Sequence, residues 1–216
     1  LGTRKWSQVT VEGLPSAESH SIVSLHGKRA LMYDDPNMYE LTLDLPRTIK
    51  GRLLSVPPAH GHTLIYMHRS KILLMGENPY NIRVFDATPS WMSWRTVPLV
   101  LAGAAPEKLP GATYTRVRDV VVAFGGMVSA RRSNLAFVLD TPTWTWSELQ
   151  YLAHDPPVGR LNHLAVSCGG NMLVFGGETV TGGVSDMWSL TVVESRGGGG
   201  GGGDGGGDGS GAGAGA

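Results

Sequence analysis

Short apolar runs of about five residues alternate with polar turns along most of this chain. The clearest runs lean towards β-branched and aromatic residues: 21–25, 63–67, 119–124, 164–167 and 172–175. Runs of this length, bounded by glycine, proline, asparagine or aspartate, are typical of strands. Proline and glycine recur up to about residue 190 and leave little room for long helices. The pattern therefore predicts an all-β fold of short antiparallel strands.

Four kinds of strand recur in the same order with a period of about fifty residues. The first kind follows a histidine in three copies: His20, His62 and His163. In the remaining copy we expect Thr113 or Thr115 at the histidine position. The third kind ends on an acidic turn. The fourth kind opens with tryptophan at three places: Trp6, Trp94 and Trp146.

The second kind of strand ends in a glycine pair in the two later copies: Gly125, Gly126, Gly176 and Gly177. The earlier copies have Gly76-Glu77 and Asp34-Asp35 instead. Glycine accepts positive φ and close approach of neighbouring backbone, so we interpret the pairs as structural. No helix pattern with Lys-Ser or Lys-Thr follows them, as a phosphate-binding loop requires.

The segments 140–146, 157–163 and 174–177 resemble the kelch repeat almost throughout, and the resemblance covers about residues 6–192. It implies a kelch-type β-propeller similar to the central domain of galactose oxidase, with about four blades of four antiparallel strands. It also implies structural roles for the repeat histidines and tryptophans. We assign residues 1–196 to this domain.

The two ends of the repeat region carry unmatched strands. The chain opens on a strand of the fourth kind, residues 6–11, and its last blade ends on a strand of the third kind, residues 187–193. Pairing the two would close a small ring and remove an exposed sheet edge. Because kelch propellers usually have more than four blades, we favour a segment of a larger propeller completed by residues outside this chain.

Composition narrows the classes of partner and compartment. Residues 197–216 contain only Gly, Asp, Ser and Ala, and we expect a disordered tail or linker. Lys plus Arg and Asp plus Glu are both 18, so nothing in the net charge favours nucleic acid. No apolar run is long enough for a membrane span, and we expect no membrane partner. The single cysteine, Cys168, suits a cytoplasmic location, with an N-terminal targeting segment left open because residue 1 is Leu.

Candidate chemistry is sparse. His60 and His62 lie on one strand face, yet no third metal ligand has a matching spacing. Glu178 and Asp186 lack the histidine that an iron site of the specifier type needs, and the ligand set of a copper radical oxidase is not assignable. We expect no catalytic residue, no cofactor and no metal. The alternative is a metal-dependent oxidase or specifier-type lyase built on the propeller.

Surface loops are the expected place for function, because propeller strands are committed to packing. Five residues in or near the loops after the glycine pairs are candidate partner-binding residues: Arg131, Arg132, Asn134, Glu178 and Arg160. The apolar connection 98–110 looks costly to expose. We expect a non-catalytic protein-binding module, a scaffold or a subunit of a larger assembly, with carbohydrate binding as a weaker alternative.

Overall fold

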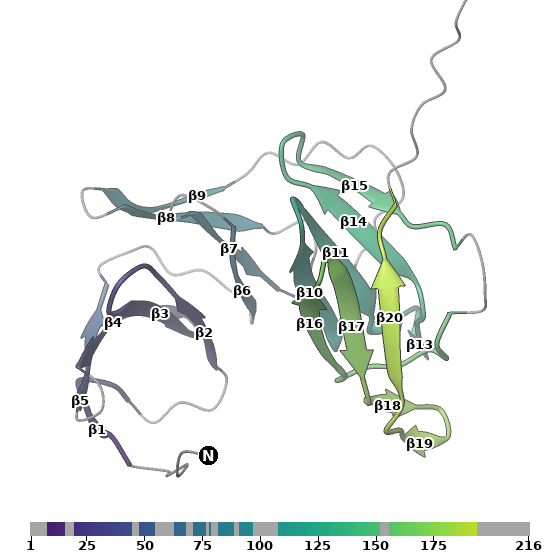
Figure 1. The fold of residues 1–216 in the computed structure, drawn as a ribbon, viewed down its shortest axis with the longest axis horizontal. Coiled ribbons are helices and arrows are strands. Elements are labelled where there is room, and N and C mark those ends of the chain that lie inside the picture. The colour runs from purple at the N-terminus through teal and green to yellow at the C-terminus, as the bar shows by residue number, and fades with distance from the viewer. Residues whose placement is uncertain are drawn as a thin grey trace, which may run out of the picture.

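The computed structural model describes residues 8–15, 20–44, 48–54, 63–67, 71–76, 78, 82–88, 91–96, 108–151 and 156–193, with the backbone alone for 20 and 91–96. Every regular element in these ranges is a β-strand, which confirms the all-β prediction. Figure 1 shows four main sheets side by side along an open arc, in chain order from purple to yellow.

The first two sheets have the order β1-β5-β4-β3-β2 and β6-β7-β8-β9. The first contains β1 (Thr10–Glu12), β2 (His20–Ser24), β3 (Arg29–Asp34), β4 (Asn37–Asp44) and β5 (Thr48–Leu53). The second contains β6 (Thr63–Tyr66), β7 (Lys71–Met75), β8 (Arg83–Thr88) and β9 (Trp91–Thr96).

The last two sheets have the order β10-β11-β14-β15 and β16-β17-β20. They contain β10 (Ala112–Val117), β11 (Val120–Gly125), β14 (Ala136–Asp140), β15 (Thr145–Glu148), β16 (Leu164–Cys168), β17 (Asn171–Phe175) and β20 (Met187–Thr191). The first strands of successive sheets contact one another, β2 with β6, β6 with β10, and β10 with β16. The four kinds of strand therefore run from the inside to the outside of each sheet, as blades of a propeller do.

The first strand excludes one of the two options for the ends of the repeat region, the small closed ring in which it would pair with the last blade. β1 pairs with β5 in parallel, with Val11 opposite Ile49, and does not pair with β20. The free edge of β5 lies next to β1. Neither Gly13 nor Gly51 has a side chain that would keep the two backbones apart. The first strand thus pairs with its own sheet, and the favoured reading as a segment of a larger propeller stays a prediction.

The register of the third sheet corrects the histidine position. Ala112 pairs with Gly125 and Thr113 with Phe124, whereas Leu164 pairs with Phe175 in the last sheet. His163 precedes Leu164, so its counterpart is Ala112 and neither Thr113 nor Thr115. A two-residue turn joins the first two strands in both sheets and gives them the same register.

Apolar side chains fill each junction between sheets. Leu31 and Tyr33 meet Ile72 and Phe85 between the first two sheets. Trp146, 1% exposed, lies in the core between the second and third sheets. A further core joins the third sheet to the last: Val117, Val122, Phe124, Ala136, Val138, Met172 and Val174. Burying each large side chain contributes about 1.5–3 kcal/mol, so the junctions are a main source of stability.

Several expectations fall outside this description. Trp6, His60, His62, most of the 98–110 connection and the tail 197–216 lie outside the described residues. The backbones of His20 and Trp94 lie in β2 and β9, but their side chains are outside the description. Their proposed structural roles stay predictions.

Candidate functional site

Two short β-hairpins project from one end of the last two sheets, each directly after a glycine pair. β12 (Met127–Val128) pairs with β13 (Arg131–Arg132), and β18 (Glu178–Thr179) pairs with β19 (Gly182–Gly183). Figure 1 shows β13, β18 and β19 at the same end of the molecule. The sequence predicted loops at these positions. We call the two together the double-hairpin surface.

The glycine pairs set where the hairpins leave the sheets. All four glycines have positive φ, from 65° at Gly176 to 99° at Gly177. A Cβ on Gly125 would lie 2.7 Å from the carbonyl oxygen of Arg160, and one on Gly177 would lie 2.8 Å from the Cβ of His163. Side chains at these positions would therefore push the chain away from the neighbouring segment.

A connecting segment, residues 158–162, lies between the two hairpins and joins them by backbone hydrogen bonds. On one side, Gly126 N donates to Arg160 O at 2.8 Å and Arg160 N donates to Ser133 O at 3.0 Å. On the other side, Leu161 and Glu178 exchange hydrogen bonds at 3.1 and 2.9 Å. The double-hairpin surface is thus held in place by ladder-like bonding on both sides.

One ion pair links the hairpins directly. The Nη2 of Arg132 donates to the Oε1 of Glu178. The side chains are 28% and 51% exposed, so the pair lies at the surface. The Nε of the same guanidinium is buried and has no hydrogen-bond partner among the described residues. The structure therefore brings together two of the residues predicted to bind a partner.

The turn of the first hairpin has a strained backbone. Val128 pairs with Arg131, so Ser129 and Ala130 form a two-residue turn, with φ of 48° and 60°. Asn-Gly is the sequence such turns favour, because other residues disfavour positive φ. Strain of this kind is commonly retained where a segment has a function. The exposed Arg131 follows directly.

Three exposed apolar side chains lie on the same hairpins and connecting segment as the ion pair, and the sequence did not single them out. Val180, 81% exposed, lies at the turn of the second hairpin, where the hydroxyl of Thr179 donates to Gly182 O at 2.9 Å. Met127 is 37% exposed and Val158 60% exposed. Their proximity depends on the register of the hairpins, which no local sequence signal gave.

The structure corrects one predicted contact residue, Arg160, whose side chain is fully buried. Its guanidinium donates to Gly176 O at 2.8 Å and makes a bidentate pair with Asp186, at 2.6 and 2.9 Å. The side chain holds the blade together from beneath the double-hairpin surface. We therefore exclude Arg160 from the partner-binding residues.

Asp186 is the acceptor that sequence reasoning did not assign to Arg160. The hydrogen bond from Arg160, followed by one from the indole of Trp188 at 2.7 Å, lowers the pKa of Asp186 to about 2. The carboxylate therefore stays charged at any neutral or mildly acidic pH and keeps the buried guanidinium paired.

His163, 3% exposed, lies beneath the same surface. Its Nε2 is 2.7 Å from the Oγ1 of Thr113, and its ring meets Phe124 edge to face. Burial, and second the positive charge of Arg160, lower the pKa of His163 to about 4. The imidazole is therefore neutral at pH 7, in keeping with the structural role expected for this repeat position.

Asn134, the fifth predicted contact residue, is partly buried and ends the first hairpin segment. Its carbonyl oxygen accepts the hydroxyl of Tyr151. Burial, and second the carboxylate of Glu148, raise the pKa of Tyr151 to about 12, so the hydroxyl remains a donor. The described backbone contact of Asn134 is thus internal.

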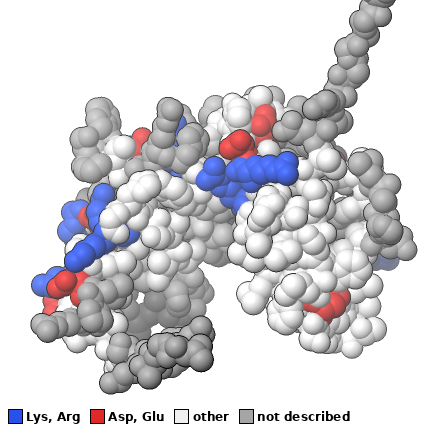
Figure 2. Space-filling view, viewed as in Figure 1, with Lys and Arg blue, Asp and Glu red and all other residues white. Residues whose placement is uncertain are grey.

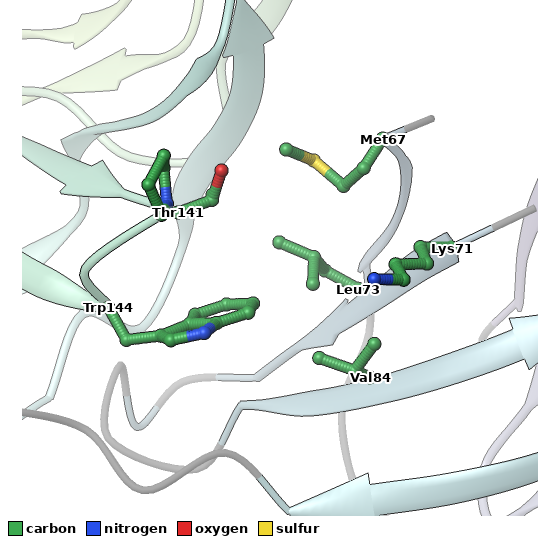
Figure 3. A pocket seen from close by; sticks show the side chains of 7 residues that line it. Met67, Lys71, Leu73, Val84, Thr141 and Trp144 are labelled. Carbon is green, nitrogen blue, oxygen red and sulfur yellow. The ribbon is translucent and has the colours of Figure 1, made fainter. Parts of the chain in front are cut away.

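A cavity of about 310 Å³ lies elsewhere, between the second and third sheets. Figure 3 shows Thr141 and Trp144 on one wall, facing Met67, Lys71, Leu73 and Val84. Trp144 has φ of 56°, which is rare for a bulky side chain, and its ring packs partly against the core. The cavity places its ring beside open space.

Two other findings concern the described residues alone. They contain no group of three or more His, Cys, Asp or Glu side chains arranged to hold a metal ion. No helix within the described part is long and apolar enough to cross a membrane.

The strand order and the glycine-pair register define blades of a kelch-type β-propeller. Residues 61–196 match the family model described as the KLHDC2/KLHL20/DRC7 Kelch-repeats domain. This match covers more than half of the chain, and the chain belongs to the kelch-repeat family. The predicted resemblance is thereby confirmed.

Two curated proteins are similar over parts of the chain. An acyl-CoA-binding domain-containing protein 4 of Arabidopsis thaliana is 31% identical over 128 residues, which are 56% of this chain and 18% of that protein. A probable serine/threonine-protein kinase of Dictyostelium discoideum is 27% identical over 96 residues, 44% of this chain and 7% of that protein. The matched region is thus less than a fifth of either relative.

Proposed function

We propose that this chain is a non-catalytic protein-binding module, a scaffold or subunit of a larger assembly, and that it contacts its partner through the double-hairpin surface. Kelch-repeat domains commonly mediate protein interactions. The observation that carries the proposal is the cross-hairpin pair of Arg132 and Glu178, with exposed Met127, Val158 and Val180 on the same hairpins and connecting segment.

The chemistry of this surface suits a protein with an acidic and apolar contact patch. Arg131 is exposed, and the guanidinium of Arg132 donates to Glu178. Arginine beside exposed apolar side chains is the composition enriched in protein interfaces. The backbone bonds to residues 158–162 fix the surface in advance, which lowers the ordering cost of binding.

The test is a double charge reversal, Arg131→Glu with Arg132→Glu, compared with the wild type by quantitative affinity purification. We expect the partners to be lost, because two acidic side chains would repel an acidic patch and also Glu178. The matched control is Lys28→Glu with Lys50→Glu on the first sheet, where both side chains are exposed and paired with carboxylates.

A second variant separates the contact from the fold. Arg132→Glu combined with Glu178→Arg restores an ion pair between the hairpins with its charges exchanged. We expect this variant to unfold at the wild-type temperature and still to lose its partners. Unchanged capture of every partner by the double reversal contradicts the proposal.

A further inference from the structure

The cavity between the second and third sheets is apolar except for one cation. Met67, Leu73 and Val84, three residues at most 4% exposed, line it. Lys71, at the start of β7, is the one charged residue among the described residues of the wall. Figure 3 shows its Nζ directed towards the open space. The volume of about 310 Å³ falls in the range of small-molecule sites, so the cavity has the size and the composition of such a site.

Lys71 lacks the counter-ion that the same repeat position has in the first sheet. The registers place Lys71 at the position of Arg29, and Val84 at the position of Glu40. In the first sheet, the Nε of Arg29 donates to the Oε1 of Glu40 at 2.7 Å. In the second sheet a valine stands at the position of that carboxylate, and within the described residues Lys71 forms no ion pair. The second sheet therefore has the cation of this pair without its anion.

The acidic residue opposite this lysine in the register is Asp86, and its carboxylate is engaged elsewhere. Its Oδ1 accepts hydrogen bonds from the backbone N and the hydroxyl of Thr88, at 3.0 and 2.8 Å. In the third sheet, Arg116 donates to the carbonyl oxygen of Met67, and its Nη2 lies 3.7 Å from the Oδ1 of Asp119. Figure 2 shows Lys and Arg side chains gathered in the middle of the view, between the second and third sheets. The lysine is thus the cation of the cavity that remains available to a ligand.

Trp144 supplies an aromatic wall from a costly backbone position. It lies in the turn between β14 and β15 with φ of 56°, a conformation that asparagine and glycine adopt more readily. Its side chain packs partly against the core of this junction, and Figure 3 shows its ring across the open space from Leu73 and Val84. A flat ring in this space would stack on the indole and contact the aliphatic side chains on its other side. The walls therefore favour a planar apolar group.

We propose that this cavity binds a small aromatic carboxylate. Its ring would lie between the indole of Trp144 and the side chains of Leu73 and Val84. Its carboxylate would accept a charge-assisted hydrogen bond from the Nζ of Lys71, and so supply the anion that Glu40 supplies in the first sheet. Because β14 runs away from the first hairpin, the cavity lies at the opposite end of the third sheet from the double-hairpin surface. The proposal is therefore independent of the proposed function.

The test is a calorimetric titration of the purified chain with 2-naphthoate, which has a flat double ring and one carboxylate. We expect one saturable site with a dissociation constant below about 1 mM. Two further probes separate the contributions, since 2-naphthamide lacks the charge and cyclohexanecarboxylate lacks the aromatic ring. Each should bind at least about tenfold more weakly than 2-naphthoate. Equal binding of either probe overturns the proposed ligand class.

Variants place the binding in this cavity. Lys71→Met should weaken the binding of 2-naphthoate about tenfold and leave that of 2-naphthamide unchanged, because only the ammonium is lost. Lys28→Met, at a 76% exposed side chain of the first sheet, is the matched control and should bind both probes like the wild type. Val84→Glu gives Lys71 an internal carboxylate, as the first sheet has, and should abolish the binding of 2-naphthoate in a chain whose circular dichroism is unchanged. A wild-type chain without a saturable site, or a folded Lys71→Met that binds 2-naphthoate as tightly as the wild type, overturns the proposal.

Discussion

At the scale of single residues, the glycine pairs are fixed by crowding as well as by φ. Gly177 has φ of 99°, and a Cβ there would meet His163 Cβ at 2.8 Å and Leu161 O at 3.0 Å. We expect Gly177→Ala to lower the free energy of unfolding by about 2–4 kcal/mol, the sum of backbone strain and overpacking. Urea denaturation followed by tryptophan fluorescence measures the loss.

Gly169→Ala is the control that separates the two causes. Gly169 also has positive φ, 58°, but no atom lies within 4 Å of the added Cβ. The free energy of unfolding should fall by about 1 kcal/mol in Gly169→Ala, from backbone strain alone. Equal losses in the two variants would show that crowding around Gly177 contributes nothing.

Residue identity alone predicted the contact residues incompletely. Arg131, Arg132 and Glu178 were predicted as surface residues, and the structure places all three there. Arg160 has the same residue type but is buried, because Asp186, 26 positions later, is folded against it. A partner so distant in sequence leaves no local signal, so the residue type alone could not distinguish the surface arginines from the buried one.

At the scale of elements, strand positions followed from the apolar runs because each run must bury one or both faces. All four innermost strands and their successors fall where the repeat predicted them. The pairing of β1 with β5 was not predicted, since three residues with exposed side chains have no apolar pattern that selects an edge. The hairpins after the glycine pairs were missed because strands of two residues are shorter than any periodicity.

Asp186 connects two elements, since it precedes β20 and holds the guanidinium of Arg160 in the connecting segment. We expect Asp186→Asn to lower the free energy of unfolding by about 3 kcal/mol, because a buried charge loses its counter-ion. Asp119→Asn is the control. The side chain of Asp119 is 94% exposed, and its Oδ1 lies 3.7 Å from the Nη2 of Arg116. The free energy of unfolding should therefore fall by no more than about 0.5 kcal/mol in this variant. The urea midpoint of each variant measures its loss of stability. Equal midpoints would mean that the carboxylate of Asp186 does not stabilise the buried guanidinium of Arg160.

At the scale of the whole molecule, stability should depend on pH through His163. Its pKa is about 4 in the folded chain, below the ordinary value of 6.5. The unfolded chain therefore binds the proton more readily, and this contribution to stability is complete above pH 6.5 and falls as the pH drops towards 4. We expect the melting temperature to decline between pH 6.5 and 4, measured by circular dichroism at constant ionic strength.

His163→Gln tests the assignment, because glutamine does not titrate. The variant should be less stable than the wild type at pH 7 and should show a shallower decline between pH 6.5 and 4. Asp186 interferes little, since its stabilising effect is lost mostly between its ordinary pKa of 3.8 and its folded pKa of about 2, below most of this range. An unchanged slope in the variant would assign the acid sensitivity to other groups.

The two ends of the row of sheets are unlike. On the outer side of the first sheet, Leu14 packs with Leu43 and Ile49 on the cluster of Ala30, Met32, Tyr39 and Leu41, which are 3–7% exposed. At the opposite end of the row, Leu164 and Val166 of the last sheet are 71% and 59% exposed. The N-terminal segment therefore shields part of the first end from solvent, and no such cover lies over the last sheet among the described residues.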